Sequence, residues 1–179
     1  GSGLYEMDGV DDVEHIEMDT PYGAPSDKIT VGAIEGNQIA FLPRHGQGHR
    51  LIPSEVPYAA NIYALKALGA KHVVSISAVG SLKEEIHPQH VVIPDQLIDR
   101  TSGRQNTLFG NGVAVHVSFS DPYCDNLRLT LSNICSDLVV PAHYGGTYVT
   151  MEGPQFSTKA EASLYRSWGA DIIGMTALP

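Results

Sequence analysis

The amino-acid sequence predicts an α/β protein with a largely parallel, twisted sheet. Residues 69–82 (GAKHVVSISAVGSL) contain strand formers followed by small residues, as expected of a buried strand. The nearly all-apolar stretch 55–68 before them predicts a helix packed on both sides, and the β-rich stretch 90–98 after them predicts another strand. Helices that alternate with strands form βαβ units, in which neighbouring strands run parallel.

The carboxyl end of the predicted 69–82 strand is the first candidate for an active site. Ligands of open α/β sheets collect outside the carboxyl ends of the strands, where backbone N–H groups and small side chains can approach them closely. Here Ser77, Ala78, Gly80 and Ser81 bring little bulk. The same stretch is equally compatible with an ordinary buried strand that ends in a glycine turn.

A β-hairpin and a helix are predicted upstream of this strand. Residues 29–34 and 38–42 are short β-rich runs, and the sequence EGN at 35–37 between them is a turn signal. An acidic surface segment precedes the hairpin. Ser54 is predicted to cap the helix that follows, and Gly69 to stop it.

Loops, strands and helices alternate again downstream. The polar stretch 102–112 predicts a mobile loop, and 114–119 alternates like a strand with His116 in its middle. The remaining predicted elements are a helix beginning at 121–122, a strand over 146–151, a helix with a Thr158–Glu161 capping box that stops at Gly169, and a last strand over 171–175.

Length and composition predict a single domain over residues 1–179. The hydrophobic fraction of 42% is ordinary for a globular protein. We find no apolar run of the roughly 18 residues that span a bilayer and no signal peptide, so a cytoplasmic protein is expected. Cys124 and Cys135 lie in one predicted helix, too distant to form a disulfide within it, and are expected to be reduced and structural.

The charge balance argues against binding to nucleic acids or anionic membranes. The sequence has 20 acidic and 11 basic residues, a net charge of −9, and seven of the acids lie in the first nineteen residues. Both kinds of surface need clustered Lys and Arg. The charge balance is compatible with a small anionic ligand, because one arginine and a few backbone N–H groups can hold a phosphate.

Both ends of the sequence predict a piece of a longer protein. The chain begins with residues 1–4 (GSGL) without methionine, and it ends at Pro179 directly after a strand-like stretch where an α/β protein would continue into a helix. Gly1-Ser2 can instead be a cloning scar.

Arg44 and His45 are the clearest candidates for anion binding. They leave a predicted strand into the glycine-bearing stretch 46–50, which places them at the rim of the sheet. Arginine offers a planar fork for phosphate or carboxylate, and histidine adds a donor. The alternative is a rim salt bridge. A metal site at His45 and His49 is disfavoured, because the intervening glycines make a helix that would align them improbable.

A second group of candidates follows the later strands. Residues 152–156 (EGPQF) form a loop whose Glu152 and Phe156 suit a sugar hydroxyl and a flat ring, although a Phe before a helix is often a hydrophobic staple. Met175 and Thr176 follow the last strand. The sequence lacks the G-x-S-x-G elbow of serine hydrolases and the G-x-G-x-x-G Rossmann fingerprint, so both of these classes are poor interpretations.

Seven motifs, taken in order, resemble the trimeric purine nucleoside phosphorylases, and most closely the methylthioadenosine phosphorylases. The likeness covers the whole chain. These motifs are SGL at 2–4, PRHG at 43–46, NIYALK at 61–66, SAVGSL at 77–82, DQLIDRT at 95–101, EGPQF at 152–156 and GMT at 174–176.

The resemblance implies a mixed sheet wrapped by helices, a homotrimer, and a phosphorolytic step of purine and methionine salvage. Methylthioadenosine and inorganic phosphate would give adenine and 5-methylthioribose 1-phosphate, with phosphate as co-substrate and no metal or organic cofactor. The implied phosphate ligands are Ser2, Arg44, His45, Ser77, Ala78 and Thr176. The implied nucleoside ligands are Met175 at the ribose, Phe156 at the purine, Glu152 near both, and His116 lent to the neighbouring subunit's site.

The residues that protonate the leaving purine stay unassigned within this sequence. In the family they are carboxylates that fall beyond Pro179. The 6-amino or 6-oxo preference therefore stays open, and a phosphorylase for 6-oxopurine nucleosides or methylthioinosine is an alternative, as is an inactive nucleoside-binding segment. A nucleosidase that uses water is disfavoured, because Arg44 would then have no phosphate to hold.

Overall fold

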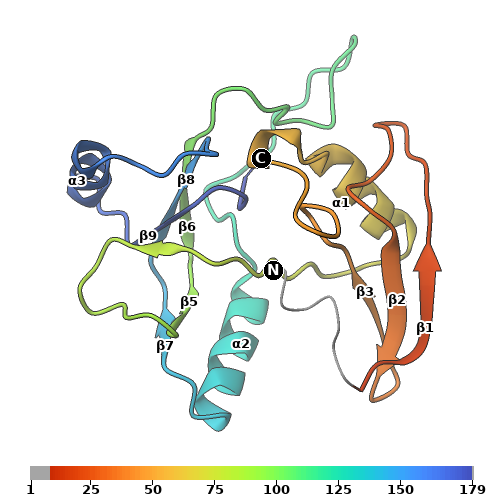
Figure 1. Ribbon diagram of the computed structural model, residues 1–179, viewed down its shortest axis with the longest axis horizontal. Helices are drawn as coiled ribbons and strands as arrows, with labels where there is room; N and C mark the ends of the chain where they lie inside the picture. Colours follow the sequence, from red (N-terminus) through yellow and green to blue (C-terminus); the bar gives the residue numbers. More distant parts are fainter. Residues whose placement is uncertain (1–8, 179) are drawn as a thin grey trace. The chain divides into compact units, whose positions relative to one another are not determined.

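The computed structural model describes residues 9–178, which group into two compact units (Figure 1). The first unit contains residues 9–77 and 103–108, and the second contains residues 78–102 and 109–178. Ser2, a predicted phosphate ligand, lies outside the described residues. The single domain predicted over residues 1–179 stays a prediction, and we describe each unit by itself.

The first unit contains a three-stranded antiparallel sheet in the order β1-β2-β3. Its strands are β1 (Asp11–Ile16), β2 (Ile29–Ile34) and β3 (Asn37–Phe41). The predicted hairpin is confirmed, with Glu35 and Gly36 at φ values of 50° and 79° in its two-residue turn. Strand β1 was not expected, because its sequence DDVEHI is mostly polar and nearly all of it is exposed.

Helix α1 (Tyr58–Ala67) follows a short 3-10 turn, η2 (Pro53–Glu55). The predicted Ser54 cap is wrong: the turn begins after Ile52, whose N–H donates to the Glu55 side chain at 3.1 Å, while α1 starts later, after Pro57. The stop at Gly69 is confirmed, because this residue adopts φ +89° and its N–H donates to the Lys66 carbonyl at 3.0 Å.

Helix α1 is buried along one face rather than on both sides. Ala60, Asn61 and Ala64 are buried, whereas Ile62 and Tyr63 are 47% and 40% exposed. The nearly all-apolar sequence does not reveal which face is buried, because the face that packs consists of small side chains and one amide.

The predicted buried strand over residues 69–82 is wrong for most of its length. Only Gly80–Ser81 forms a strand, β4, and it pairs antiparallel with β9. Residues 71–79 pair with no described strand, and Val73, Val74 and Ile76 are each about half exposed. A ladder needs a neighbouring strand on at least one side, and none among the described residues reaches this segment.

The second unit contains a four-stranded mixed sheet in the order β4-β9-β8-β6 (Figure 1). Strands β6 (Gln96–Arg100), β8 (Thr147–Met151) and β9 (Ile172–Gly174) are parallel to one another. A separate parallel pair is formed by β5 (Val91–Ile93) and β7 (Ala142–Tyr144). The mixed α/β class is confirmed.

Two helices complete the second unit. Helix α2 (Asp125–Asp137) begins later than predicted, after Cys124. Its Arg128 stacks on the Tyr144 ring of β7 at 4.6 Å. Helix α3 (Lys159–Ser167) begins with the predicted capping box, in which the Thr158 hydroxyl accepts from the Glu161 N–H.

The core of the second unit lies between α3 and the mixed sheet. Tyr165 of α3 is 6% exposed and packs with Val149, which is fully buried in β8. The other buried members of this cluster are Leu82, Met151, Ala170 and Ile173. This packing fixes β8 and β9, the strands from which the candidate site residues project.

The strand predicted over residues 114–119 is absent. This segment has no ladder partner among the described residues, and Val117 and Phe119 are 70% and 57% exposed. The 90–98 run forms strands but is divided, because Pro94 between β5 and β6 has no N–H for a ladder bond. No helix within residues 9–178 is long and apolar enough to cross a membrane.

Candidate functional site

The carboxyl ends of β6, β8 and β9 lie side by side in the second unit. Arg100 pairs with Met151, and Thr150 pairs with Gly174, so the residues that follow the three strands emerge at one edge of the sheet (Figure 1). This is the edge where ligands of α/β sheets collect. The sequence predicted this placement for Glu152, Met175 and Thr176.

Glu152 is fixed by the chain that leaves the neighbouring strand. Its Oε2 accepts the Ser102 N–H at 2.5 Å, and its side chain is half-buried. Thr101, one residue earlier, is held by Asp99, whose Oδ1 accepts from the Thr101 N–H at 2.8 Å and from its hydroxyl at 2.7 Å. The Glu152 carboxylate thus ties the chain after β8 to the chain after β6, and the Asp99 carboxylate fixes the turn just before that contact.

Met175 packs against the loop that carries Glu152. A Cβ added to Gly153 would stand 2.5 Å from the Met175 sulfur, and Gly153 has φ +68°, so this position favours glycine on both counts. Thr176 is only 8% exposed. Glu152, Met175 and Thr176 therefore form one group at the sheet edge, which we call the strand-end group.

The other predicted residues of the second unit are placed differently. Ala78 precedes β4, and because Gly80 pairs antiparallel with Ile173, the chain before Gly80 runs along the side of β9 that leads to Met175. Phe156 is 83% exposed in the loop before α3. His116 is exposed in segment 114–119. The structure does not bring Phe156 or His116 into the strand-end group.

In the first unit, Arg44 is held by serine hydroxyls. Its guanidinium donates to the Ser75 Oγ at 2.7 Å and to the Ser77 Oγ at 2.8 Å. Arg44 and Ser77 were both predicted phosphate ligands, and the structure brings them together; Ser75 was missed. A hydroxyl that accepts from a guanidinium keeps its own O–H, so both serines can still donate to an anion.

His45 is fixed by the loop that follows it. Its Nδ1 lies 2.9 Å from the Leu51 carbonyl oxygen. A carbonyl only accepts, so Nδ1 carries the proton and Nε2 is the acceptor nitrogen of the neutral ring. Burial lowers the pKa of His45 below its ordinary value, with smaller effects from His49 and Arg44. The ring is therefore neutral near pH 7.

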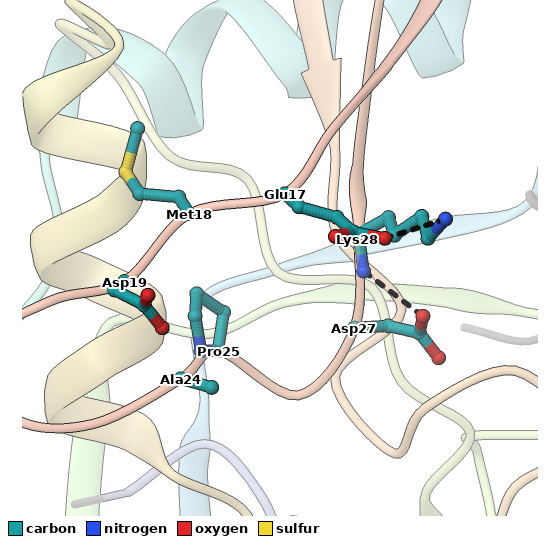
Figure 2. Close-up of a pocket in the computed structure, with 7 residues that line it drawn as sticks. All are labelled: Glu17, Met18, Asp19, Ala24, Pro25, Asp27 and Lys28. Carbon is teal, nitrogen blue, oxygen red and sulfur yellow. Dashed lines mark hydrogen bonds and ion pairs between the residues drawn. The ribbon is translucent and has the colours of Figure 1, made fainter.

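The first unit also has a hollow that contains none of the predicted site residues. Figure 2 shows its lining. It comprises Glu17, Met18, Asp19, Ala24, Pro25, Asp27 and Lys28. The lining has three carboxylates and one lysine, and that lysine is paired with Glu17 at 2.6 Å. This charge balance opposes an anionic ligand, so we do not place the phosphate here.

Nothing in the described residues groups three or more potential metal ligands. The His45 and His49 rings stack in parallel, with centroids 4.2 Å apart, which does not direct their nitrogens at one ion. Cys124 and Cys135 are both free thiols.

Two contacting residues were missed in the sequence, one that has no signal there and one whose signal is its spacing from Ser77. Ser102 reaches Glu152 through its backbone N–H, which every residue type except proline could supply. Ser75 lies two positions before Ser77, and period-2 alternation would have placed both side chains on one face of the predicted strand.

Comparison with known proteins gives the family. A model of the phosphorylase superfamily matches residues 1–179. The S-methyl-5′-thioadenosine phosphorylase of Geobacter sulfurreducens is 56% identical over 180 residues, which span all of this chain and 63% of that relative. The corresponding enzyme of Synechocystis is 53% identical and is matched over 56% of its length. The chain thus spans less than two thirds of these relatives.

Solved structures agree with the sequence relatives. The methylthioadenosine phosphorylase of Schistosoma mansoni in complex with adenine has a TM-score of 0.94 at 33% identity, covering 99% of this chain and 72% of that one. A methylthioadenosine phosphorylase from an antarctic soil metagenomic library has a TM-score of 0.92 at 52% identity, covering 98% and 62%. The chain belongs to the phosphorylase superfamily, and in sequence and fold it is similar to methylthioadenosine phosphorylases.

Proposed function

We propose that the protein carrying this chain catalyses phosphorolysis of S-methyl-5′-thioadenosine. In this reaction the glycosidic C1′–N9 bond breaks, its electron pair passes to the purine, and a phosphate oxygen bonds to C1′. The purine gains a proton and leaves as adenine, and the sugar becomes 5-methylthioribose 1-phosphate. The observation that carries the proposal is the Arg44 guanidinium held by Ser75 and Ser77, in a chain similar to enzymes of this name.

Arg44, His45 and Ser77 would bind the phosphate. The guanidinium supplies a fixed positive charge, and the serine hydroxyls supply donors to the phosphate oxygens. The neutral His45 ring would offer Nε2 to the remaining O–H of hydrogen phosphate. A phosphate held this way stabilises the positive charge that develops on the sugar and captures it. Ser2 remains a predicted ligand outside the described residues.

The strand-end group would bind the nucleoside. The Glu152 carboxylate suits sugar hydroxyls, and the Met175 thioether suits an apolar sugar face. Thr176 and the Ala78 backbone would add phosphate contacts, and Phe156 would cover the purine. Inorganic phosphate is then a co-substrate, and the reaction as written needs no metal or organic cofactor.

We also propose a homotrimer in the cytoplasm, in which His116 serves a neighbouring subunit. Supporting this assembly, the segment around His116 exposes Val115, Val117 and Phe119 at 43%, 70% and 57%. Apolar side chains in such a row are covered in a stable assembly at a favourable free energy. In the trimer, the neighbouring subunit would cover these apolar side chains.

The proposed function is tested by replacing Arg44 with Ala in the complete protein. Adenine release from methylthioadenosine should depend on phosphate in the wild type. The replacement removes a charge-assisted contact worth about 1.5–3 kcal/mol, so the KM for phosphate should rise by roughly 10- to 150-fold. Arg44→Lys keeps the charge but loses the fork and should recover part of the loss. Adenine release at the same rate without phosphate would indicate a nucleosidase and refute the proposal.

A further inference from the structure

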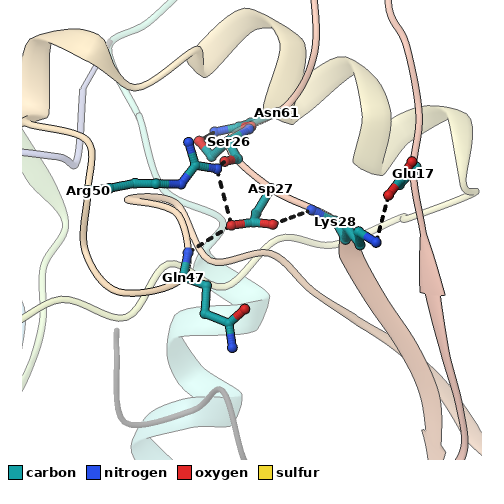
Figure 3. Close-up of polar contacts among 7 residues, drawn as sticks. All are labelled: Glu17, Ser26, Asp27, Lys28, Gln47, Arg50 and Asn61. Atoms are coloured by element: carbon teal, nitrogen blue, oxygen red, sulfur yellow. Dashed lines mark hydrogen bonds and ion pairs between the residues drawn. The ribbon is translucent and has the colours of Figure 1, made fainter.

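We propose that Asp27 is a positioning residue for phosphate binding, acting through the loop of residues 43–51 that carries Arg44 and His45. We call these residues the phosphate loop. The inference rests on the proposed function and adds to it a residue that does not itself touch the substrates. Its basis is the set of polar contacts that join Asp27 to the phosphate loop in the first unit (Figure 3).

Asp27 binds the phosphate loop at two points. Its Oδ2 accepts the Gln47 N–H at 2.8 Å and lies 3.3 Å from the Arg50 guanidinium (Figure 3). Its other oxygen accepts the Lys28 N–H at 2.9 Å, which fixes the carboxylate's orientation. The contact with Gln47 and the charge of Arg50 lower the pKa of Asp27, so the carboxylate is ionised near neutral pH.

The chain around Asp27 is itself anchored on α1. Ser26 and Asn61 form a buried reciprocal pair, in which the Ser26 N–H donates to the Asn61 Oδ1 and the Asn61 amide donates to the Ser26 Oγ, both at 2.8 Å. Arg50 also donates to the Ser26 carbonyl at 2.8 Å. Asp27 therefore links the phosphate loop to a chain segment that is anchored on the buried face of α1.

The phosphate loop transmits this anchoring to His45. Leu51 lies next to Arg50. Its carbonyl oxygen accepts a hydrogen bond from the His45 Nδ1 at 2.9 Å, and its N–H donates to the His45 carbonyl at 3.0 Å. Gly46 packs so closely on Arg50 that an added Cβ would stand 2.8 Å from the Arg50 Nε. Release of Arg50 and Gln47 would thus loosen Gly46 and Leu51, which hold His45, and through His45 the adjacent Arg44.

The alternative is that Asp27 makes an ordinary ion pair that only stabilises the fold. The two interpretations differ in what they predict for phosphate. A stabilising pair lowers the melting temperature and leaves the KM values of the folded enzyme unchanged. A positioning residue changes the KM for phosphate, and it changes the environment of the His45 ring.

The experiment compares Asp27→Ala, Asp27→Asn and wild type as complete proteins, assayed well below the melting temperature of each. Asp27→Ala should raise the KM for phosphate by about tenfold, the size expected for a lost charge-assisted contact, with the KM for methylthioadenosine within about twofold. Asp27→Asn keeps an oxygen for the Gln47 N–H, so its KM for phosphate should lie between those of the wild type and Asp27→Ala. The ¹⁵N NMR signals of the His45 ring should lose the Nδ1–H tautomer pattern in Asp27→Ala.

Glu17→Gln is the matched control. It breaks the 2.6 Å ion pair with Lys28, the residue next to Asp27. Both partners are mostly exposed, and this ion pair does not involve the phosphate loop. The phosphate KM and the His45 spectrum should stay at wild-type values in this variant.

An unchanged phosphate KM together with an unchanged His45 spectrum in Asp27→Ala would overturn the inference, as would equal changes in Glu17→Gln. If the wild type releases no adenine with phosphate, the proposed function fails instead. The positioning role is then decided by calorimetric titration with inorganic phosphate and by the His45 spectrum. Weaker phosphate binding and an altered ring in Asp27→Ala support it, and wild-type behaviour in both rejects it.

Discussion

Replacement of Gly174 with Ala should disturb the strand-end group through a single steric conflict. Gly174 is the last residue of β9 and pairs with Thr150 of β8. A Cβ at this position would overlap the Tyr148 hydroxyl and stand 2.7 Å from the ring carbon that bears it. Tyr148 is 4% exposed, so its ring cannot swing into solvent to make room. Gly174 is therefore required because a larger side chain would have no space. Its backbone conformation does not require glycine, because its φ lies outside the left-handed region.

The expected cost follows from overpacking a close-packed core. Inserting one methylene-sized group into such a core costs about 1–3 kcal/mol in the free energy of unfolding. For a protein of this size each kcal/mol lowers the melting temperature by roughly 2–4 °C, so a fall of about 2–12 °C is expected. Met175 and Thr176 follow Gly174 directly, so a shift of β9 should also raise the KM for the nucleoside.

Thermal unfolding and nucleoside kinetics measure these two effects. Gly103→Ala is the matched control, because an added Cβ there meets nothing within 4 Å. It should change the unfolding free energy by no more than about 0.5 kcal/mol. Tyr148→Phe removes the overlapping oxygen and should restore part of the stability of Gly174→Ala. A Gly174→Ala protein with the stability and KM of the Gly103→Ala control would refute the reasoning.

Two further predictions concern His45 and the assembly. Burial lowers the pKa of His45 in the folded state, so the unfolded chain binds its proton more readily. The stability that the neutral ring contributes should be complete above pH of about 6.5, the ordinary histidine pKa, and be lost as the pH falls from there through the folded pKa. Urea unfolding of wild type and His45→Gln should then show a smaller loss on acidification in the variant, and parallel curves would reject this. Sedimentation of the complete protein should give a trimer, and a fully active monomer would contradict the shared site.

The elements that the sequence predicted well are those with local signals. The β2–β3 hairpin has its turn residues between two β-rich runs, and the start of α3 has a capping box within four residues. The grouping of Glu152 with Met175 was predictable too, because parallel strands deliver their following residues to a common edge. In each case the information lies in the segment itself or in a general rule of sheet topology.

The failures share a different cause. Residues 73–76 and 114–119 have apolar strand patterns, yet a pattern indicates only that a segment can pair and not that a partner lies beside it. Strand β1 was missed for the opposite reason. Its polar composition does not indicate a strand, but its backbone pairs with β2. The Ser54 cap was wrong because Glu55 accepts the N–H of Ile52, and this contact places the cap at Ile52, two residues earlier.

Asp27 lies beyond local signals for the same reason, because its contacts join residues 20 and 23 positions apart. Those contacts also resolve an electrostatic difficulty. With its net charge of −9, this chain repels phosphate at long range, so the proposed phosphate binding depends on short-range donors. A carboxylate behind the phosphate loop would normally worsen this repulsion. Arg50 lies 3.3 Å from Asp27 and offsets its charge, so Asp27 can hold the Gln47 N–H while the charge of Arg44 stays available for the proposed phosphate.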